Sequence, residues 1–153
     1  MKDYMTHALS KAKDGFKQGE VPVGCVIVVR ATGEILSAAT NRTETDKDPS
    51  AHAEVLAIRE ACRKRGDVRL PDCDLYVTLE PCTMCAAAIS FARIQNLYFG
   101  AYDPKGGGVD HGARFYQQAT CHHRPEVFGG MNEEECAQLL KKFFQARRGL
   151  ADK

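Results

Sequence analysis

The sequence predicts an α/β domain in which helices flank a β-sheet. Apolar runs rich in β-branched residues alternate along the chain with segments whose apolar residues recur at helical spacing, and this alternation is typical of layered α/β folds. The chain has 153 residues, which is the usual length of one domain. Because no repeat, low-complexity tract or linker divides it, we expect a single domain over residues 1–153.

The N-terminal part of the chain predicts a helix followed by a β-hairpin. Apolar residues recur at helical spacing over residues 5–16, and Gly19 is expected to end that helix. Residues 21–29 are rich in β-branched side chains and indicate a buried strand. A glycine-containing turn separates this strand from its expected hairpin partner, residues 35–40. The polar residues 41–47 indicate a loop.

The middle of the chain predicts two helices, each followed by a strand. Asp48-Pro49 combines a capping residue with proline, which favours the start of a helix running to about Lys64. A strand is expected over 74–79, a helix over 81–93 and another strand over 95–100. Right-handed crossover connections would make these later strands neighbours in one sheet.

The C-terminal part predicts a long loop and a final helix. Residues 103–121 include a run of three glycines, and a connection of this length in a compact domain is often functional. A short helix is expected within it near residues 109–116. Asn132 and Glu135 have the spacing of a capping box for the last helix.

Charge and cysteine usage restrict the class of protein. The formal net charge is +1, so nucleic-acid binding would have to come from local charge. Residues 141–153 carry five basic side chains against one acidic one, a local charge of +4, although cations also favour an ordinary helix C-terminus. We expect no secretory leader and no membrane-spanning apolar stretch. Its seven cysteines are an odd number, and we expect reduced thiols in the cytoplasm.

Two short motifs suggest a catalytic metal site. His52-Ala53-Glu54 lies at one expected helix start, and Pro81-Cys82-Thr83-Met84-Cys85 lies at the next. The cysteines are three apart, so they share a helix face near the positive end of its dipole, which favours thiolates. Two thiolates and one imidazole are the three protein ligands of a catalytic zinc that keeps a fourth position for water. Glu54 is the expected carrier of protons.

Other interpretations of these motifs remain open. A Cys-x-x-Cys pair after a strand also occurs at redox sites, but a redox site has no need of His52 and Glu54. A structural zinc completed by His122 or His123 would normally show two tight ligand pairs. Residues two apart on a regular helix point about 200° apart, so His52 and Glu54 can share one site only if His52 lies in an irregular first turn.

The sequence resembles the bacterial tRNA-specific adenosine deaminases, within the zinc-dependent cytidine and deoxycytidylate deaminase superfamily. The resemblance covers about residues 20–148. The His-x-Glu and Pro-Cys-x-x-Cys motifs are shared by many deaminases, whereas the Val-Pro-Val-Gly start and the Phe-Phe-x-x-Arg-Arg ending are more particular to the tRNA enzymes. The matching segments are Glu20–Gly24, Asn41–Arg42, Ala51–Glu54, Leu75–Cys82, Phe99–Ala101 and Phe143–Arg148.

The resemblance implies a three-layer cytidine-deaminase-like fold with a central mixed sheet of about five strands flanked by helices. It also implies a homodimer that converts the wobble adenosine of a tRNA anticodon, for instance in an arginine tRNA, to inosine. One zinc ion per chain would be held by His52, Cys82 and Cys85. Glu54 would move a proton from the zinc-bound water to the purine ring and the leaving ammonia.

The same resemblance implies a set of substrate contacts. Asn41 would hydrogen-bond the flipped base, and Ala53 would belong to the same substrate site. Asp103 and Lys105 would lie beside the anticodon nucleotides. On the last helix, two residues would border the RNA: Phe144 and Arg147.

One position departs from the family pattern, and other functions remain to be separated. Family members commonly carry Asn-His where this chain has His122-His123; His122 could still stack on a base. A deaminase of free guanine or cytosine would have no need of the basic helix end. A non-catalytic zinc-dependent RNA-binding module would have no need of Glu54.

Overall fold

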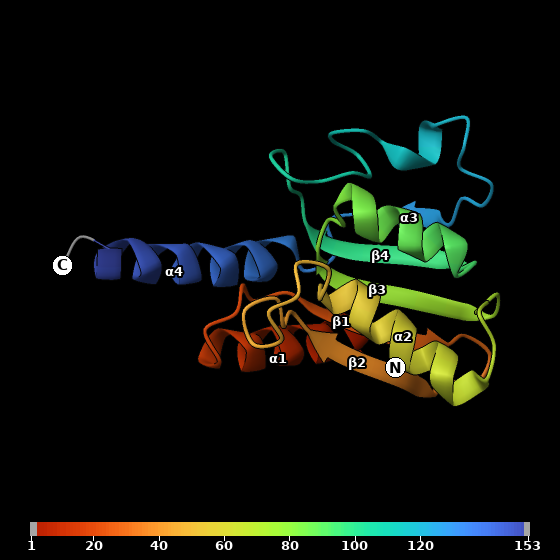
Figure 1. The fold of residues 1–153 in the computed structure, drawn as a ribbon, viewed down its shortest axis with the longest axis horizontal. Coiled ribbons are helices and arrows are strands. Elements are labelled where there is room, and N and C mark those ends of the chain that lie inside the picture. The colour runs from red at the N-terminus through yellow and green to blue at the C-terminus, as the bar shows by residue number, and fades with distance from the viewer. Residues whose placement is uncertain (1–2, 152–153) are drawn as a thin grey trace.

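The computed structural model describes residues 3–151, and its central feature is a five-stranded sheet between two layers of helices (Figure 1). The elements in chain order are α1 (Tyr4–Lys17), β1 (Gly24–Val29), β2 (Ile35–Thr40), α2 (Ala53–Arg65), β3 (Cys73–Leu79), α3 (Thr83–Phe91), β4 (Asn96–Ala101), the 3₁₀ helix η1 (Phe115–Gln117), β5 (Glu126–Phe128) and α4 (Glu133–Ala151).

The strand order in the sheet is β2-β1-β3-β4-β5. Strand β1 pairs antiparallel with β2 and β3, whereas the β3–β4 and β4–β5 pairs are parallel. The hairpin and the adjacent later strands were expected from the sequence. The sheet is therefore mixed, as the family resemblance implies, and it has five strands.

The two faces of the sheet are covered by different helices (Figure 1). Cys25 and Ile27 of β1 pack in the cluster that contains the buried alanines of α2 and Ile89 of α3. Val26 and Val28 pack on the opposite face with α1 and the start of α4. Burial on both faces explains why β1 is an unbroken apolar run rather than an alternating one.

Two predicted element starts are wrong by three residues or more. Strand β1 begins at Gly24 rather than at residue 21, because Pro22 has no N–H for a ladder. Helix α2 begins at Ala53 rather than at Asp48. The Asp48 carboxylate accepts hydrogen bonds from the backbone N–H and the hydroxyl of Ser50, so Asp48 caps a separate turn ahead of the helix.

The C-terminal predictions also need correction. The expected short helix near 109–116 is reduced to η1. Asn132 has a φ of 53°, which differs from the extended backbone of a capping box. Its amide instead donates to the Glu135 carboxylate over 3.5 Å. Within residues 3–151, no helix combines the length and the apolar character needed to cross a membrane.

Candidate active site

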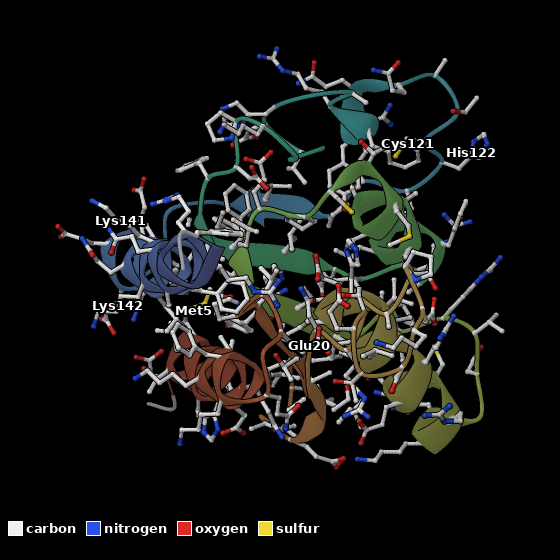
Figure 2. The ribbon with its side chains drawn as sticks, turned by 60° about the vertical axis from the view of Figure 1, so that its left-hand side comes forward. Met5, Glu20, Cys121, His122, Lys141 and Lys142 are labelled. Carbon is white, nitrogen blue, oxygen red and sulfur yellow. The ribbon has the colours of Figure 1, made fainter. Side chains whose placement is uncertain are left out.

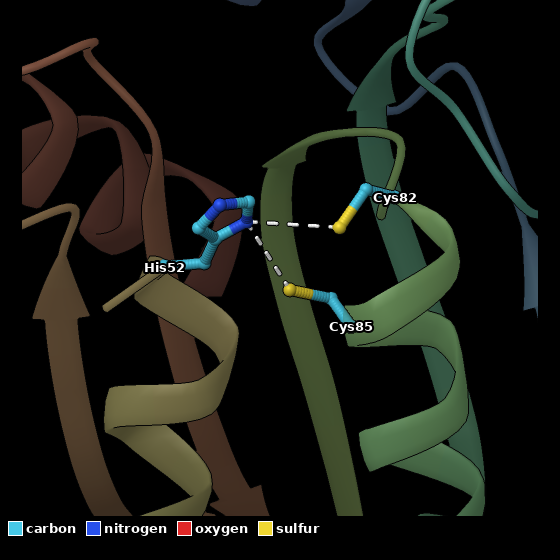
Figure 3. A group of neighbouring side chains, drawn as sticks. All are labelled: His52, Cys82 and Cys85. Atoms are coloured by element: carbon cyan, nitrogen blue, oxygen red, sulfur yellow. Dashed lines mark hydrogen bonds between the residues drawn. The ribbon is translucent and has the colours of Figure 1, made fainter. Parts of the chain in front are cut away.

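The three expected metal ligands converge at the N-termini of α2 and α3 (Figure 3). His52 is the N-cap of α2 and Cys82 is the N-cap of α3, both with extended backbone, while Cys85 lies in the first turn of α3. His52 therefore stands outside the regular helix, and the condition for sharing one site with Glu54 is met.

The spacing of the donor atoms fits a tetrahedral zinc ion. The His52 Nδ1 atom lies 3.7 Å from the Cys82 sulfur and 3.5 Å from the Cys85 sulfur. Zn–S bonds of about 2.3 Å and Zn–N bonds of about 2.0 Å at the tetrahedral angle require a nitrogen–sulfur separation of about 3.5 Å. All three ligand atoms lie within 4.8 Å of one another, so one ion can bind all of them.

The local electrostatics prepare the site for a cation. The Cys85 thiol donates to the Cys82 sulfur, and this hydrogen bond, with the nearby His52, lowers the pKa of Cys82 to about 4. The same hydrogen bond and burial raise the pKa of Cys85. The hydrogen bond to Cys82 raises the pKa of His52. The metal-free site thus holds a thiolate at Cys82 at neutral pH, ready to bind a metal.

Glu54 is buried beside these ligands, with 4% of its surface exposed. Desolvation, reinforced by the charge at Cys82, raises its pKa from 4.5 to about 7. A carboxylate whose pKa lies near the working pH can both accept and release a proton. This is the property that a proton shuttle requires.

The raised pKa of Glu54 predicts a pH-dependent stability of the metal-free protein. Because the folded state binds this proton more tightly than the unfolded chain, the contribution of Glu54 to stability is retained below about pH 4.5. This contribution should fall by up to about 3 kcal/mol as the pH rises through 7. The low pKa of Cys82 acts in the opposite sense in both proteins, so the contribution of Glu54 is the difference between wild type and Glu54→Gln. Urea unfolding of the two chelated proteins at pH 5 and pH 8 should show the wild type losing stability relative to the variant, and equal pH dependence in the two proteins would contradict the prediction.

A cavity of about 310 Å³ opens onto the ligands, at the lower end of the range for small-ligand sites. The Asn41 side-chain oxygen accepts the backbone N–H of Ala53 over 2.8 Å, which leaves the Asn41 amide N–H groups for a ligand. A larger hollow of about 410 Å³ lies between α1, β2 and α2, but it contains none of the metal ligands. The residues lining the smaller cavity are Val21, Val23, Asn41, Thr43, His52, Glu54, Leu79, Glu80, Cys82, Asp103 and Gly106.

The expected RNA contacts occupy different positions around this cavity. Asp103 lines it, and Lys105 is exposed on the same loop. Phe144 is 44% exposed on α4. The Arg147 guanidinium donates to the carbonyl of Gly19 over 2.8 Å, two residues before Val21 in the cavity wall. His122 is exposed in the loop before β5 and does not line the cavity.

Sequence reasoning missed two buried carboxylates, Glu20 and Glu80. Both accept hydrogen bonds from loop backbone that borders the cavity. Burial opposes ionisation of each carboxyl group, but these hydrogen bonds outweigh it and lower both pKa values. The sequence signal that could have identified them is a glutamate next to an apolar strand: Glu20 precedes β1 and Glu80 follows β3.

Comparisons with known proteins agree with this geometry. Residues 1–101 match the family model of the cytidine and deoxycytidylate deaminase zinc-binding region. A tRNA-specific adenosine deaminase from Agrobacterium fabrum is 52% identical over 145 residues, covering 95% of this chain and 94% of the relative. A tRNA-specific adenosine deaminase from Bacillus subtilis is 45% identical and covers 95% and 89%.

Solved structures extend the likeness to three dimensions. A structure from a study of A-to-I editing by tRNA:A34 deaminases at the wobble position superimposes with a TM-score of 0.86 at 53% identity, covering 89% of this chain and 97% of that one. A guanine deaminase from Nitrosomonas europaea gives a TM-score of 0.78 at 21% identity, covering 91% and 81%. The second match concerns the fold alone.

Proposed function

Because this chain belongs to the cytidine and deoxycytidylate deaminase family, we propose that it is a zinc-dependent hydrolase that converts adenosine to inosine at the wobble position of a tRNA anticodon. The observation that carries this proposal is the convergence of His52, Cys82 and Cys85 beside a buried Glu54. The substrate follows from relatives of 45–52% identity that span nearly the whole chain.

The chain's own residues supply binding and proton transfer. Zinc held by His52, Cys82 and Cys85 would activate water for attack on the ring at neutral pH. Glu54 accepts a proton from the attacking water and delivers it to the purine ring, and then assists the departure of ammonia. Asn41 donates its free amide N–H groups to the base. Its bond to the Ala53 backbone N–H fixes that orientation.

The RNA is expected to cover the cavity mouth. Unpaired anticodon bases cost little to extrude into a cavity. The loop with Asp103 and Lys105 would flank the target nucleotide on one side. Phe144 and Arg147 would border it on the other, where Arg147 also stacks 4.9 Å above the ring of Phe143. His122 lies apart from this group, so we assign it no contact with the target base.

Removing the α4 contacts should weaken RNA binding. Phe144→Ala is expected to raise the Kd for an anticodon stem-loop about tenfold, because one base–aromatic stack contributes about 1–3 kcal/mol. Arg147→Ala should weaken binding and flatten its salt dependence. Lys142→Ala is the charge-matched control, because Lys142 is two residues from Phe144, does not share its helix face, and lies with Lys13 and Leu139 instead. Fluorescence anisotropy at several salt concentrations measures these effects; equal losses in all three variants would contradict the assignment.

We further propose a homodimer that acts in the cytoplasm on an arginine tRNA. Free tRNA is present there, and the seven cysteines, all free thiols, suit a reducing compartment. Sedimentation at micromolar concentration tests the assembly, and a monomer would refute it.

Inosine formation is the direct test of the function. The zinc-loaded protein is incubated with an arginine-tRNA anticodon stem-loop that carries adenosine at the wobble position, beside the Glu54→Ala variant. Nucleoside mass spectrometry should detect inosine with the native protein only. If no inosine forms while zinc is bound, the substrate assignment is wrong, and free guanine, adenine and cytosine become the next substrates to test.

A further inference from the structure

Glu80 is a buried carboxylate that belongs to neither the metal ligands nor the proton-transfer machinery. It follows β3 and is 1% exposed. Both of its oxygens are occupied by N–H donors of the loop after β4. Its donors are the Asp103 N–H (3.1 Å) and the His111 Nδ1–H (2.7 Å) to Oε1, and the backbone N–H groups of Val109 (3.3 Å), Asp110 (3.0 Å) and His111 (3.1 Å) to Oε2.

These five hydrogen bonds hold both ends of the 103–111 loop to one carboxylate. The donors come from its first residue, Asp103, and from its last residues, 109–111. Between them, Gly107 packs directly against Glu80: a Cβ atom on Gly107 would lie 2.3 Å from Oε2. Glycine at position 107 is therefore explained by close approach to the carboxylate, whereas Gly108 packs against Thr83 at the start of α3.

The loop held in this way forms one wall of the catalytic cavity. Asp103 and Gly106 line the cavity, as does Glu80 itself. Glu80 also lies two residues before the ligand Cys82. One carboxylate thus connects the metal-binding segment at the start of α3 with the wall that faces the substrate.

The opposite wall has its own anchor. Glu20 is fully buried (Figure 2) and accepts hydrogen bonds from the 43–45 segment, in which Thr43 lines the cavity. Its donors are the hydroxyl groups of Thr43 and Thr45 and the backbone N–H groups of Glu44 and Thr45. The chain therefore contains a matched control for Glu80, a second buried carboxylate that anchors a different wall.

We propose that Glu80 is a positioning residue that fixes the 103–111 loop as the RNA-facing wall of the cavity and thereby sets affinity for the RNA substrate. This inference rests on the proposed function, since it takes the ligand of that wall to be RNA. A carboxylate suits the position because all five partners are donors and an ionised carboxylate only accepts. An amide would present its own N–H groups to some of these donors.

The test is Glu80→Gln in the zinc-loaded protein. Hydrogen exchange of the amides of residues 109–111 should accelerate about ten- to hundredfold, because hydrogen bonds to a charged group are lost. Exchange of residues 43–45 should be unchanged. Glu20→Gln should give the reverse pattern. Unchanged exchange at 109–111 would overturn the proposal.

Kinetics separate positioning from a general loss of structure. Zinc content should remain one per chain, and KM for the stem-loop should rise about tenfold, the usual scale for a group that orients the residues of a site. The change in kcat should be smaller. The exposed Glu34→Gln is the neutral control. An unchanged KM, or a fall in kcat alone, would overturn the proposal.

A second variant covers the case in which Glu80→Gln does not fold. His111→Ala removes one of the five hydrogen bonds to Glu80. It should accelerate exchange at residues 109–111 and raise KM as Glu80→Gln does, but to a smaller extent. If it changes neither, the proposal is overturned. Hydrogen exchange measures how firmly Glu80 holds the loop, and this measurement needs no substrate. Failure of the native protein to form inosine would therefore count against the proposed function, whereas normal exchange in both variants would count against the role of Glu80.

Discussion

Replacement of Glu54 by glutamine is expected to lower kcat for inosine formation by about 10²- to 10⁴-fold, the usual contribution of a positioned acid–base group. Glutamine keeps the shape of the side chain and its place at the start of α2, but it cannot exchange a proton. The loss should fall on kcat rather than on KM, because the group acts while protons move.

The metal site should survive this replacement. Glu54 is not among the residues whose donor atoms converge, so zinc should remain at one per chain and RNA affinity should change little. Burying a neutral amide also removes the cost of burying a charge. The variant should therefore fold at least as well as the wild type at neutral pH.

Glu60→Gln is the matched control for this experiment. Glu60 lies on the same helix but pairs with Lys64 near the surface, where its side chain is 39% exposed. Single-turnover deamination and zinc analysis of the three proteins would measure the effect. Wild-type kcat in Glu54→Gln would refute the role of Glu54 as the proton carrier, and loss of zinc would show that Glu54 supports the metal instead.

The layered fold and the metal ligands could be predicted because each depends on a local pattern. The β-branched run of β1 and the helical spacing of apolar residues in α1 each show, within one short segment, which side chains that element will bury. The ligands His52, Cys82 and Cys85 stand at helix N-termini, positions that the preceding strand or turn marks in the sequence. The mixed sheet confirms the fold that the resemblance implies.

The helix boundary ahead of the site was harder to predict, because it depends on side-chain hydrogen bonds that compete with helix capping. Asp48-Pro49 has the composition of a helix start, yet the Asp48 carboxylate bonds Ser50 and closes a turn. The helix begins only at Ala53, with His52 as its cap. This displacement frees the His52 ring from the helix and directs it at the sulfurs, so the error in the boundary and the convergence of the three expected ligands have one cause.

The buried anchors could not be predicted, because their partners are backbone groups distant in sequence. Glu80 bonds residues 23–31 positions away, and four of its five donors are backbone N–H groups, which every residue type except proline provides. No spacing rule connects a glutamate with such donors. The glycine run was visible in the sequence, but the packing of Gly107 against Glu80 follows only from the fold.

Replacement of Cys82 by serine is expected to remove zinc and, with it, all measurable inosine formation. Serine presents a hydroxyl group that stays protonated at neutral pH, whereas zinc binds the thiolate. With His52 and Cys85 alone, the site would have two of the three protein ligands that a catalytic zinc uses. Zinc should therefore fall well below one atom per chain after dialysis.

Cys62→Ser is the control for this variant. Cys62 is a half-buried thiol on the outer part of α2, whose pKa is raised by burial. Zinc analysis and deamination should match the wild type. Retention of one zinc by Cys82→Ser would refute the ligand assignment, whereas loss of zinc from Cys62→Ser would show that the assay reports general damage.

The low pKa of Cys82 allows the same assignment to be tested on the native protein. In chelated protein near pH 6, Cys82 is a thiolate because the Cys85 thiol and His52 stabilise its charge, while the burial-raised pKa keeps Cys62 protonated. Iodoacetamide followed by peptide mass spectrometry should modify Cys82 well before Cys62, and zinc should protect Cys82. Equal labelling of the two would contradict a preformed thiolate. Labelling of Cys82 that zinc does not slow would contradict its role as a ligand, because coordination to zinc withdraws charge from the sulfur and lowers its reactivity toward alkylation.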